Sequence, residues 1–221
     1  MAFIKKIKVR ILTPNGSLHY PALTSPDTKF ADTRKPDGEY KAGVILDPTD
    51  EATMKLVASL EKVRDDYRQE RIDACDKPAD AKKLERFSVR PVFTEQLDDD
   101  GDVTGNIVVK ASQAATIVAK TGKTHHFGIT VVDSQLKKVN QPVWSGSEGI
   151  LSVDASGYDM QTDKSFGVSL SLVGCQVTKL VSGAGGGDDT SGFGVVAGGF
   201  VETAPVAVDA DDAEGESDID F

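Results

Sequence analysis

Apolar and polar residues alternate at the start of the chain, which is the pattern of a β-strand with one buried face. One side holds Ile7, Val9 and Ile11, and the opposite side holds Lys6, Lys8 and Arg10. Because successive side chains of a strand point to opposite faces, this segment is expected to place its apolar side on a core and its basic side in solvent. A row of exposed basic residues is a candidate surface for phosphates.

Turn-forming residues dominate the next segment, from Pro14 to Gly38, and predict a long loop before a second strand over Tyr40–Leu46. A loop of this length is usually functional or disordered. Its basic and aromatic residues favour a functional loop, and they are Tyr20, Lys29, Phe30, Arg34 and Lys35.

A helix is predicted after Asp47, the expected N-cap, with Pro48 at the first helical position, and it is expected to run to about Ile72. An apolar stripe follows the helical period at Leu56, Leu60, Val63 and Tyr67. The helix is therefore expected to pack on one face only. The polar stretch Lys77–Arg86 predicts a loop or a short helix.

Strand patterns dominate from Ser88 onward and predict a mostly antiparallel β domain that carries one substantial helix. In the last strand the apolar phase changes near Gly174, which predicts a bulge. A glycine-rich stretch then ends the fold and predicts a flexible linker. The predicted strands are Ser88–Glu95, Ile107–Lys120, His125–Asp133, Gly149–Tyr158 and Phe166–Val181.

Negative charge is concentrated at the carboxyl end of the chain. Residues 181–221 hold ten acidic groups and no Lys or Arg, so they account for the net charge of −10. Residues 1–180 hold 25 acidic and 25 basic groups. The folded part is therefore neutral overall, and the acidic balance of the whole chain does not exclude nucleic acid as a ligand.

The last twenty residues are the most acidic segment. Residues 202–221 carry eight acidic side chains and no basic one, and they close with Asp218, Ile219, Asp220 and Phe221. Such a segment cannot bury enough apolar surface to offset the entropy of ordering, so we expect a disordered interaction tail with Phe221 as its hydrophobic contact. It can also compete with a polyanion for a basic groove. The alternative is a solubilising tail.

Motifs that suggest catalysis or metal binding fail on their spacing. Gly122-Lys123-Thr124 lacks the first glycine and the following helix of a P-loop, and Asp98–Asp102 lacks the glutamate of an EF-hand, so both predict hairpin turns. His125 and His126 are adjacent in a predicted strand, point to opposite faces and have no further ligand at metal spacing. The chain is therefore predicted to be a protein without enzymatic activity, metal or cofactor.

The compartment follows from the cysteines and from apolar runs. Cys75 and Cys175 are too few for a disulfide framework and are expected to be reduced. No apolar run has the length of a membrane span, and the start lacks the apolar core of a secretory signal. A cytoplasmic protein without membrane contact is expected.

Aromatic residues beside turns or charges are candidates for stacking on unpaired bases. For each of them, packing in the core of a β scaffold is the alternative. Tyr20 and Tyr158 are favoured for stacking because their neighbours are loop-like. The full set is Tyr20, Phe30, Tyr40, Trp144 and Tyr158.

Several stretches resemble the single-stranded DNA-binding proteins of short-tailed, T-odd bacteriophages, the gene 2.5 family, in order over nearly the whole chain. One departure is Asp37, which stands where that family has an arginine important for DNA handling. Either Arg34 and Lys35 supply that charge, or the annealing of complementary DNA strands differs from that of the family. The stretches are Lys35–Lys41, Ile129–Ser134 with Lys137 and Lys138, Phe166–Leu180 with Gly185–Asp189, and Asp218–Phe221.

The resemblance implies a mainly β OB-fold, a five-stranded Greek-key barrel, with one inserted α-helix and a disordered acidic C-terminal tail. The expected division is an OB-fold single-stranded DNA-binding domain over residues 1–182, a flexible linker over 183–200, and the tail with its terminal Phe over 201–221. It also implies that residues 218–221 recruit phage or host replication proteins such as DNA polymerase, and that two copies form a homodimer by exchanging tails.

The expected function is binding of single-stranded DNA without sequence preference, protecting and organising it during phage replication and recombination in the cytoplasm of the infected bacterial host cell. One alternative is a structural or adaptor protein of the phage particle that binds no DNA. A metal-dependent hydrolase acting at the acidic loop near Asp100 ranks last. The candidate DNA-binding residues are Lys6, Lys8, Arg10, Tyr20, Lys29, Phe30, Arg34, Lys35, Trp144 and Tyr158.

Overall fold

A computed structural model describes residues 7–29 and 31–181 of the protein. Predictions that concern Lys6, Phe30, the linker over 183–200 and the tail over 201–221 lie outside the described residues. The described residues are mainly β structure, with helices α1 (Glu51–Asp73) and α2 (Pro78–Glu85). The strands are β1 (Val9–Leu12), β2 (Gly16–Asp27), β3 (Glu39–Leu46), β4 (Ser88–Val89), β5 (Thr94–Leu97), β6 (Val103–Ala114), β7 (Thr116–Val118), β8 (Thr124–His126), β9 (Thr130–Val132), β10 (Glu148–Met160) and β11 (Ser165–Lys179).

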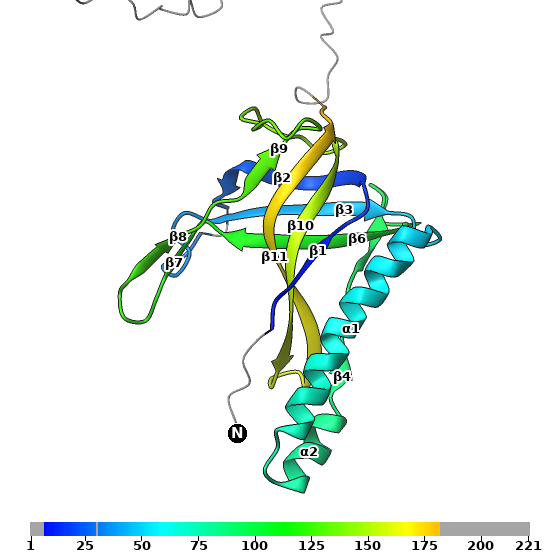
Figure 1. Ribbon diagram of the computed structural model, residues 1–221, viewed down its shortest axis with the longest axis vertical. Helices are drawn as coiled ribbons and strands as arrows, with labels where there is room; N and C mark the ends of the chain where they lie inside the picture. Colours follow the sequence, from blue (N-terminus) through cyan, green and yellow to red (C-terminus); the bar gives the residue numbers. More distant parts are fainter. Residues whose placement is uncertain (1–6, 30, 182–221) are drawn as a thin grey trace, which may run out of the picture. The chain divides into compact units, whose positions relative to one another are not determined.

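Five strands close into a barrel in the order β2, β3, β6, β11, β10 and back to β2 (Figure 1). Neighbours in this ring are antiparallel except β6 and β11, which run parallel and meet at a single pair, Ser112 and Ser171. Taken in chain order, the first three strands form a meander, and the fifth strand lies between the third and the fourth. This arrangement is the partly open, five-stranded Greek-key barrel of the OB-fold, as predicted.

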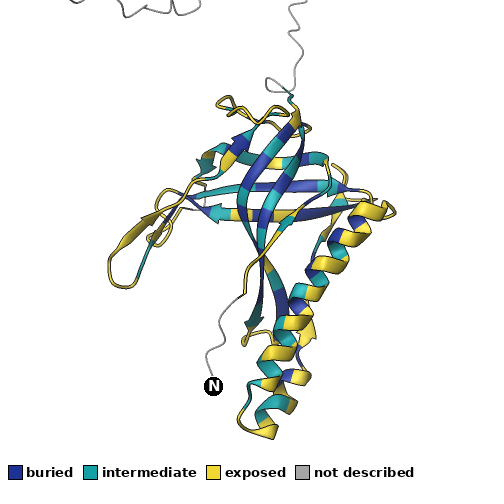
Figure 2. Ribbon diagram, in the orientation of Figure 1, coloured by how far each residue is buried: buried dark blue, intermediate teal, exposed yellow. Residues whose placement is uncertain are grey.

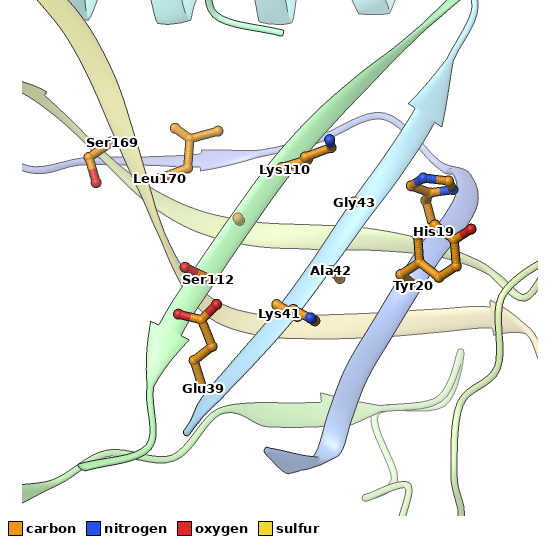
Figure 3. Close-up of a pocket in the computed structure, with 11 residues that line it drawn as sticks. His19, Tyr20, Glu39, Lys41, Ala42, Gly43, Lys110, Ser112, Ser169 and Leu170 are labelled. Atoms are coloured by element: carbon orange, nitrogen blue, oxygen red, sulfur yellow. The ribbon is translucent and has the colours of Figure 1, made fainter. Parts of the chain in front are cut away.

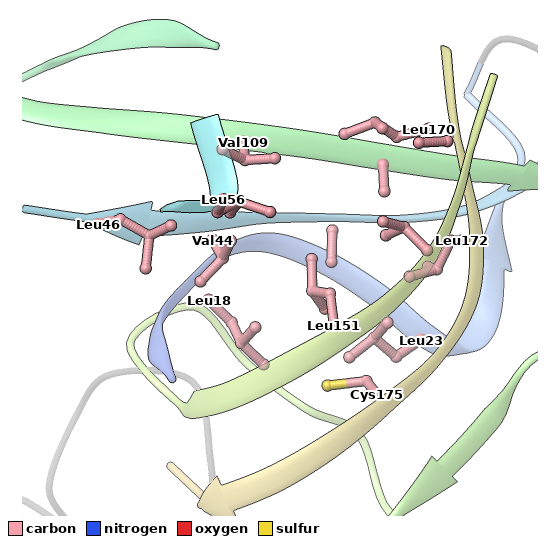
Figure 4. Packing of buried hydrophobic residues seen from close by; sticks show 14 of the residues in the cluster. Leu18, Leu23, Val44, Leu46, Leu56, Val109, Leu151, Leu170, Leu172 and Cys175 are labelled. Carbon is pink, nitrogen blue, oxygen red and sulfur yellow. The ribbon is translucent and has the colours of Figure 1, made fainter. Parts of the chain in front are cut away.

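The barrel interior is filled by aliphatic side chains from every strand of the ring (Figure 4). Leu18, Val44, Val109, Leu151 and Leu172 are almost completely buried. Burial of each such side chain stabilises the fold by roughly 1.5 to 3 kcal/mol. Because strand side chains alternate, the residues on either side of each core position point out of the barrel.

The long loop predicted over Pro14–Gly38 is wrong, because its first half contains the first barrel strand, β2 (Gly16–Asp27). Leu18 and Leu23 of β2 are buried in the core. Its pairing with β3 is interrupted between His19 and Ala22 and again between Ala22 and Asp27. Pro21 and Pro26 lie in these gaps and have no N–H to donate to the sheet, so the strand resembles a loop in sequence. The described residues of the β2–β3 loop are 28, 29 and 31–38.

Helix α1 begins three residues later than predicted. Asp50 is the N-cap, and its carboxylate accepts a hydrogen bond from the Thr53 backbone N–H, whereas the Asp47 carboxylate accepts one from Thr49 in the turn before the helix. The side chain of Thr53 is buried, which places the first helical turn against the barrel. The predicted apolar stripe is confirmed: Leu56 and Leu60 are buried, and Val63 and Tyr67 are partly buried.

The β10–β11 hairpin extends beyond the barrel, and α1 runs beside this extension (Figure 1). Tyr67 of α1 donates a hydrogen bond to the Asp159 carboxylate of β10 at 2.7 Å. In the barrel half of the hairpin, Ser152 pairs with Gly174 and Val153 with Leu172, so β11 carries an extra residue there. The bulge predicted near Gly174 is confirmed.

The polar stretch after α1 forms a short helix that belongs to a second apolar cluster. Leu84 of α2, Phe87 and Phe166 of β11 are almost completely buried together. The predicted alternatives of loop or short helix are thus decided in favour of a helix over Pro78–Glu85. Among the described residues, no helix combines the length and the apolar composition needed to span a membrane.

Candidate functional site

A cleft of about 500 Å³ crosses the outer face of the barrel (Figure 3). Strands β2, β3, β6 and β11 supply its walls and floor. Figure 3 shows Lys41 and Glu39 on β3, Lys110 and Ser112 on β6, and His19 and Tyr20 on β2. The lining residues are His19, Tyr20, Glu39, Lys41, Ala42, Gly43, Lys110, Ala111, Ser112, Ser169 and Leu170.

The alternation of β3 and β6 sorts polar residues into this cleft. Lys110 and Ser112 point outward because Val109 and Ala111 point into the core. Gly43 lies between the neighbouring strands, where a Cβ atom would come within 2.8 Å of Val108 Cγ1. The centre of the floor therefore has no room for a side chain on Gly43, which is itself buried.

The charge of the cleft is weakly positive. Lys41 pairs with Asp27, and Glu39 pairs with Lys35 at 3.2 Å, so these groups largely neutralise one another. Lys110 forms no ion pair with any residue in the described part of the chain. Burial and the nearby charge of Lys110 lower the pKa of His19, so its imidazole is neutral near pH 7. The positive charge of Lys110 on the floor of the cleft is therefore not neutralised by an ion pair with any described residue.

An aromatic edge borders the cleft at β2. The Tyr20 side chain is 72% exposed, and its backbone adopts a positive φ of 45°, which is uncommon for a non-glycine residue. Its N–H donates to Ser145 Oγ at 3.0 Å, and its ring meets that of His19 edge to face at 4.3 Å. An unusual backbone conformation that presents an aromatic ring to solvent is typical of a binding site.

Trp144 lies in a loop that packs against β2 beside Tyr20. Leu18 accepts a hydrogen bond from Gly146 and donates one to Ser147, so the loop that carries Trp144 lies against β2. The Trp144 side chain is 44% exposed. The structure therefore brings the two predicted stacking residues Tyr20 and Trp144 to one edge of the barrel.

The β2–β3 loop continues the cleft with basic residues. Asp32 organises it by accepting hydrogen bonds from the backbone N–H groups of Lys35 and Arg34, which lower the pKa of Asp32. A hollow of about 180 Å³ lies between this loop and the cleft and shares Glu39 and Lys41 with it. The predicted residues Lys29, Arg34 and Lys35 are exposed on this loop.

Three other predicted residues lie away from the cleft. Arg10 is on β1 and Lys8 directly precedes that strand; β1 pairs with β10, and neither strand lines the cleft. Arg10 forms an ion pair with Asp154 of β10. Tyr158 is partly buried on β10, and its ring covers Gly167 of β11, where a Cβ atom would come within 2.5 Å of Tyr158 Cζ. Tyr40, another candidate for stacking on bases, packs against the core.

Sequence reasoning missed the cleft residues His19, Lys41 and Lys110. The signal for Lys110 was present, because it is a single charge within the apolar stretch Ile107–Ala111 and must point outward when its neighbours are buried. His19 was hidden by the mistaken assignment of β2 as a loop. Lys41 was seen only as part of a strand.

The motifs that failed on spacing are turns in the structure. Gly122 lies in the β7–β8 turn with φ of +80°, and Asp98 caps the β5–β6 turn by accepting from the Asp100 and Asp102 N–H groups. In residues 7–29 and 31–181 no three His, Cys, Asp or Glu side chains lie close enough to hold a metal ion. Cys75 and Cys175 are free thiols, and burial raises the pKa of Cys175 to about 12.

Comparison with known proteins gives a family match over most of the chain. The family model described as single-stranded DNA-binding protein, bacteriophage T7, matches residues 16–180. The match begins at β2 and ends after β11, so it covers the whole barrel. No curated protein matches the chain by sequence.

Solved structures of phage proteins share the fold. The crystal structure of gp2.5, a single-stranded DNA-binding protein encoded by bacteriophage T7, is 22% identical, with a TM-score of 0.59, and the match covers 89% of this chain and 100% of that one. The single-stranded DNA-binding protein from bacteriophage Enc34 in complex with ssDNA is 13% identical, with a TM-score of 0.52, over 82% of this chain and 95% of that one. At sequence identities this low, the structural similarity establishes a shared fold.

Proposed function

The chain belongs to the family of the bacteriophage T7 single-stranded DNA-binding protein, and from this membership we propose that the cleft across β2, β3, β6 and β11 is its DNA-binding surface. The function of the family is binding, not catalysis. The observation that carries the proposal is the cleft itself, which combines Lys110, a lysine without an ion pair to any described residue, with an aromatic edge at Tyr20 on the outer face of an OB barrel. Strands two and three of such barrels form the face that takes oligonucleotides.

Two forces hold the strand in this proposal. Lys110 on the floor and Arg34 and Lys35 on the β2–β3 loop attract the phosphates and release their counterions. Tyr20 and Trp144 offer rings on which bases stack, and stacking of this kind contributes roughly 1 to 3 kcal/mol per base. Stacking accepts every base and phosphate contacts carry no sequence information, so binding is expected to be sequence-tolerant.

The proposal is tested by titrating the full-length protein with an oligothymidylate of roughly 30 nucleotides. This length is about twice the longest stretch that one OB barrel covers. The single Trp144 reports binding by fluorescence. Lys110→Ala is expected to weaken binding and lower the salt slope by about 0.7, whereas Tyr20→Ala costs about 1 to 3 kcal/mol and keeps the slope. Lys55→Ala removes an exposed lysine of α1, a helix that does not line the cleft, and is the charge-matched control.

Absence of binding by the folded protein at low salt, with the acidic tail removed, would contradict the proposal and leave the adaptor alternative. Equal effects of Lys110→Ala and Lys55→Ala would show that binding depends on net charge and not on the cleft. Circular dichroism of each variant separates loss of binding from loss of fold.

The wider role follows from the family and the tail composition. We propose that the protein protects and organises single-stranded DNA during phage replication and recombination in the cytoplasm of the infected host. The acidic segment over residues 202–221 has the charge to compete with DNA for the cleft. Phe221 and its carboxylate are the groups that a partner pocket on a replication protein such as DNA polymerase can capture, and a homodimer formed through the tails is part of the same proposal.

The partner role has its own test. Pull-down of the phage or host DNA polymerase by the wild-type protein is expected to fail when Phe221 alone is removed, because that change deletes the single aromatic side chain of residues 202–221 while keeping the eight acidic groups. Affinity for DNA is expected to stay unchanged in the same variant. Equal recovery of the polymerase by both proteins would contradict recruitment through Phe221.

A further inference from the structure

Residues 115–127, which we call the arm, form a hairpin outside the barrel. Strands β7 and β8 pair only with each other, in a sheet separate from the barrel sheet. Lys120, Thr121 and Gly122 make the turn between them, and Gly122 has the positive φ that such a turn requires. Figure 1 shows the arm projecting to the left of the barrel, and Figure 2 shows that most of it is exposed.

The arm is fastened to the β2–β3 loop. The Val118 N–H donates to the Arg34 carbonyl at 3.0 Å, and the Ala115 N–H donates to the Gly38 carbonyl at 2.9 Å. Thr116, a buried residue at its base, donates its hydroxyl proton to the Asp37 carboxylate. An isolated two-stranded hairpin is at best marginally stable, so these contacts hold the arm in place. Asp37 thus joins the loop to the arm.

The arm carries only positive and neutral side chains. Its sequence contains Lys120, Lys123, His125 and His126 and no Asp or Glu. Neither lysine forms an ion pair with any residue that the structure describes. Ile117 and Phe127 are also exposed, at 38% and 42%, so the arm does not extend the barrel core. An exposed, cationic hairpin of this kind is suited to a polyanion.

The arm is continuous with the cleft through basic residues. Lys35 borders the hollow that shares Lys41 with the cleft, and the next residue, Arg34, supplies the carbonyl that pairs with the arm. A DNA strand that leaves the cleft over the β2–β3 loop passes acidic groups that already have partners. Asp27 pairs with Lys41, and Glu39 pairs with Lys35. Asp32 is engaged by backbone N–H groups and Asp37 by Thr116.

We propose that the arm is a second contact surface for single-stranded DNA, on which Lys120 and Lys123 bind the phosphates of nucleotides that extend beyond the cleft. This inference rests on the proposed function of the cleft. The occupant is the sugar-phosphate backbone, because Lys120 and Lys123 at the turn of the arm are exposed positive charges without an ion pair to any described residue. Since only a long strand can reach both surfaces, the arm contributes to the affinity for long oligomers and not for short ones.

The double variant Lys120→Ala/Lys123→Ala tests the inference with oligothymidylates of roughly 5 and roughly 16 nucleotides, the two ends of the range that one OB barrel covers. For the long oligomer, affinity at low salt is expected to fall at least about fivefold and the salt slope by about 1.4, since two phosphate contacts are lost. For the short oligomer, no change is expected. Lys55→Ala/Lys62→Ala on the exposed face of α1 removes the same charge and is the matched control.

A second measurement uses the wild-type protein and needs no variant. Acetylation by an amine-reactive reagent, read by mass spectrometry, is expected to be slowed at Lys120 and Lys123 by the long oligomer but not by the short one. Lys55 and Lys62 serve as internal controls. Unprotected arm lysines in the DNA complex, or equal losses of affinity in the arm and control variants, would overturn the inference.

Failure of the inference is distinguishable from failure of the proposed function. If the arm variant behaves as wild type while Lys110→Ala weakens binding of both oligomers, the cleft stands and the arm does not. If the wild-type protein binds neither oligomer at low salt, the proposed function itself fails, and the inference fails with it.

Discussion

Gly157 of β10 is a residue at which α1 closely approaches the long hairpin. A Cβ atom at this position would lie 2.2 Å from Tyr67 Cβ and 2.4 Å from Tyr67 Cγ. The absence of a side chain on Gly157 is therefore what allows Tyr67 to pack against β10, where its hydroxyl reaches Asp159. The close approach depends on one glycine and one aromatic residue from distant parts of the chain.

Gly157→Ala is expected to destabilise the protein by about 1 to 3 kcal/mol, because the added methyl forces Tyr67 away from the sheet. The free energy of unfolding from urea titration gives the measurement. Gly128→Ala is the matched control, since a Cβ atom at Gly128 would meet nothing within 4 Å, and it is expected to change stability little. Equal stabilities of the two variants would contradict the close contact.

At the scale of elements, α1 is joined to the β10–β11 hairpin by a charged cluster. The Asp159 carboxylate accepts hydrogen bonds from Tyr67, Arg71 and Gln161. Burial alone would raise the pKa of Asp159, but the hydrogen bonds and the charge of Arg71 outweigh it and lower that pKa below its ordinary value. Burial and the same carboxylate raise the pKa of Tyr67 to about 12.

Asp159→Asn is therefore expected to cost about 1 to 3 kcal/mol of unfolding free energy at pH 7, where the wild-type carboxylate is ionised. Because the folded-state pKa is lowered, this contribution is complete above the unfolded pKa and is lost as the pH falls through the folded value. Urea titrations at pH 7 and at progressively lower pH should show the two proteins converging. A difference that stays constant below about pH 4, the ordinary carboxyl pKa, would argue against this cause.

At the scale of the whole molecule, the two halves of the charge distribution oppose each other. Residues 1–180 balance their charges, whereas residues 181–221 hold ten acidic groups and no basic one. Lys110 in the cleft and Lys120 and Lys123 on the arm form no ion pair with any residue that the structure describes. The acidic segment and single-stranded DNA are both polyanions, so they are expected to compete for the same lysines and arginines.

Removal of residues 202–221 is expected to tighten binding to single-stranded DNA, and most strongly at low salt, where charges are least screened. Fluorescence titration across a salt series measures the effect. A variant in which the eight acidic residues become Asn or Gln, with Phe221 retained, controls for the length of the chain and should behave like the deletion. Unchanged or weaker binding by both variants would contradict competition.

The local patterns of the sequence were sufficient for most elements. Alternation predicted β3, β10 and β11, and the 3.6-residue period predicted the apolar stripe of α1, because both depend only on which neighbours are apolar. The phase change at Gly174 was enough to predict the bulge in β11. The pattern failed at β2, where Pro21 and Pro26 interrupt the pairing and only burial of Leu18 and Leu23 against distant strands reveals a strand.

The sequence by itself determined the β-rich class, the acidic carboxyl end and the charge balance of the body, because these follow from composition and from contacts between near neighbours. The tertiary structure alone decided which charges share a surface. Lys110 and Tyr20 come from strands far apart in sequence and meet because β2, β3 and β6 are neighbours in the barrel. Arg10 and Tyr158, equally plausible in sequence, are placed on β1 and β10 outside that cleft, since strand pairing and not residue type sets where a side chain points.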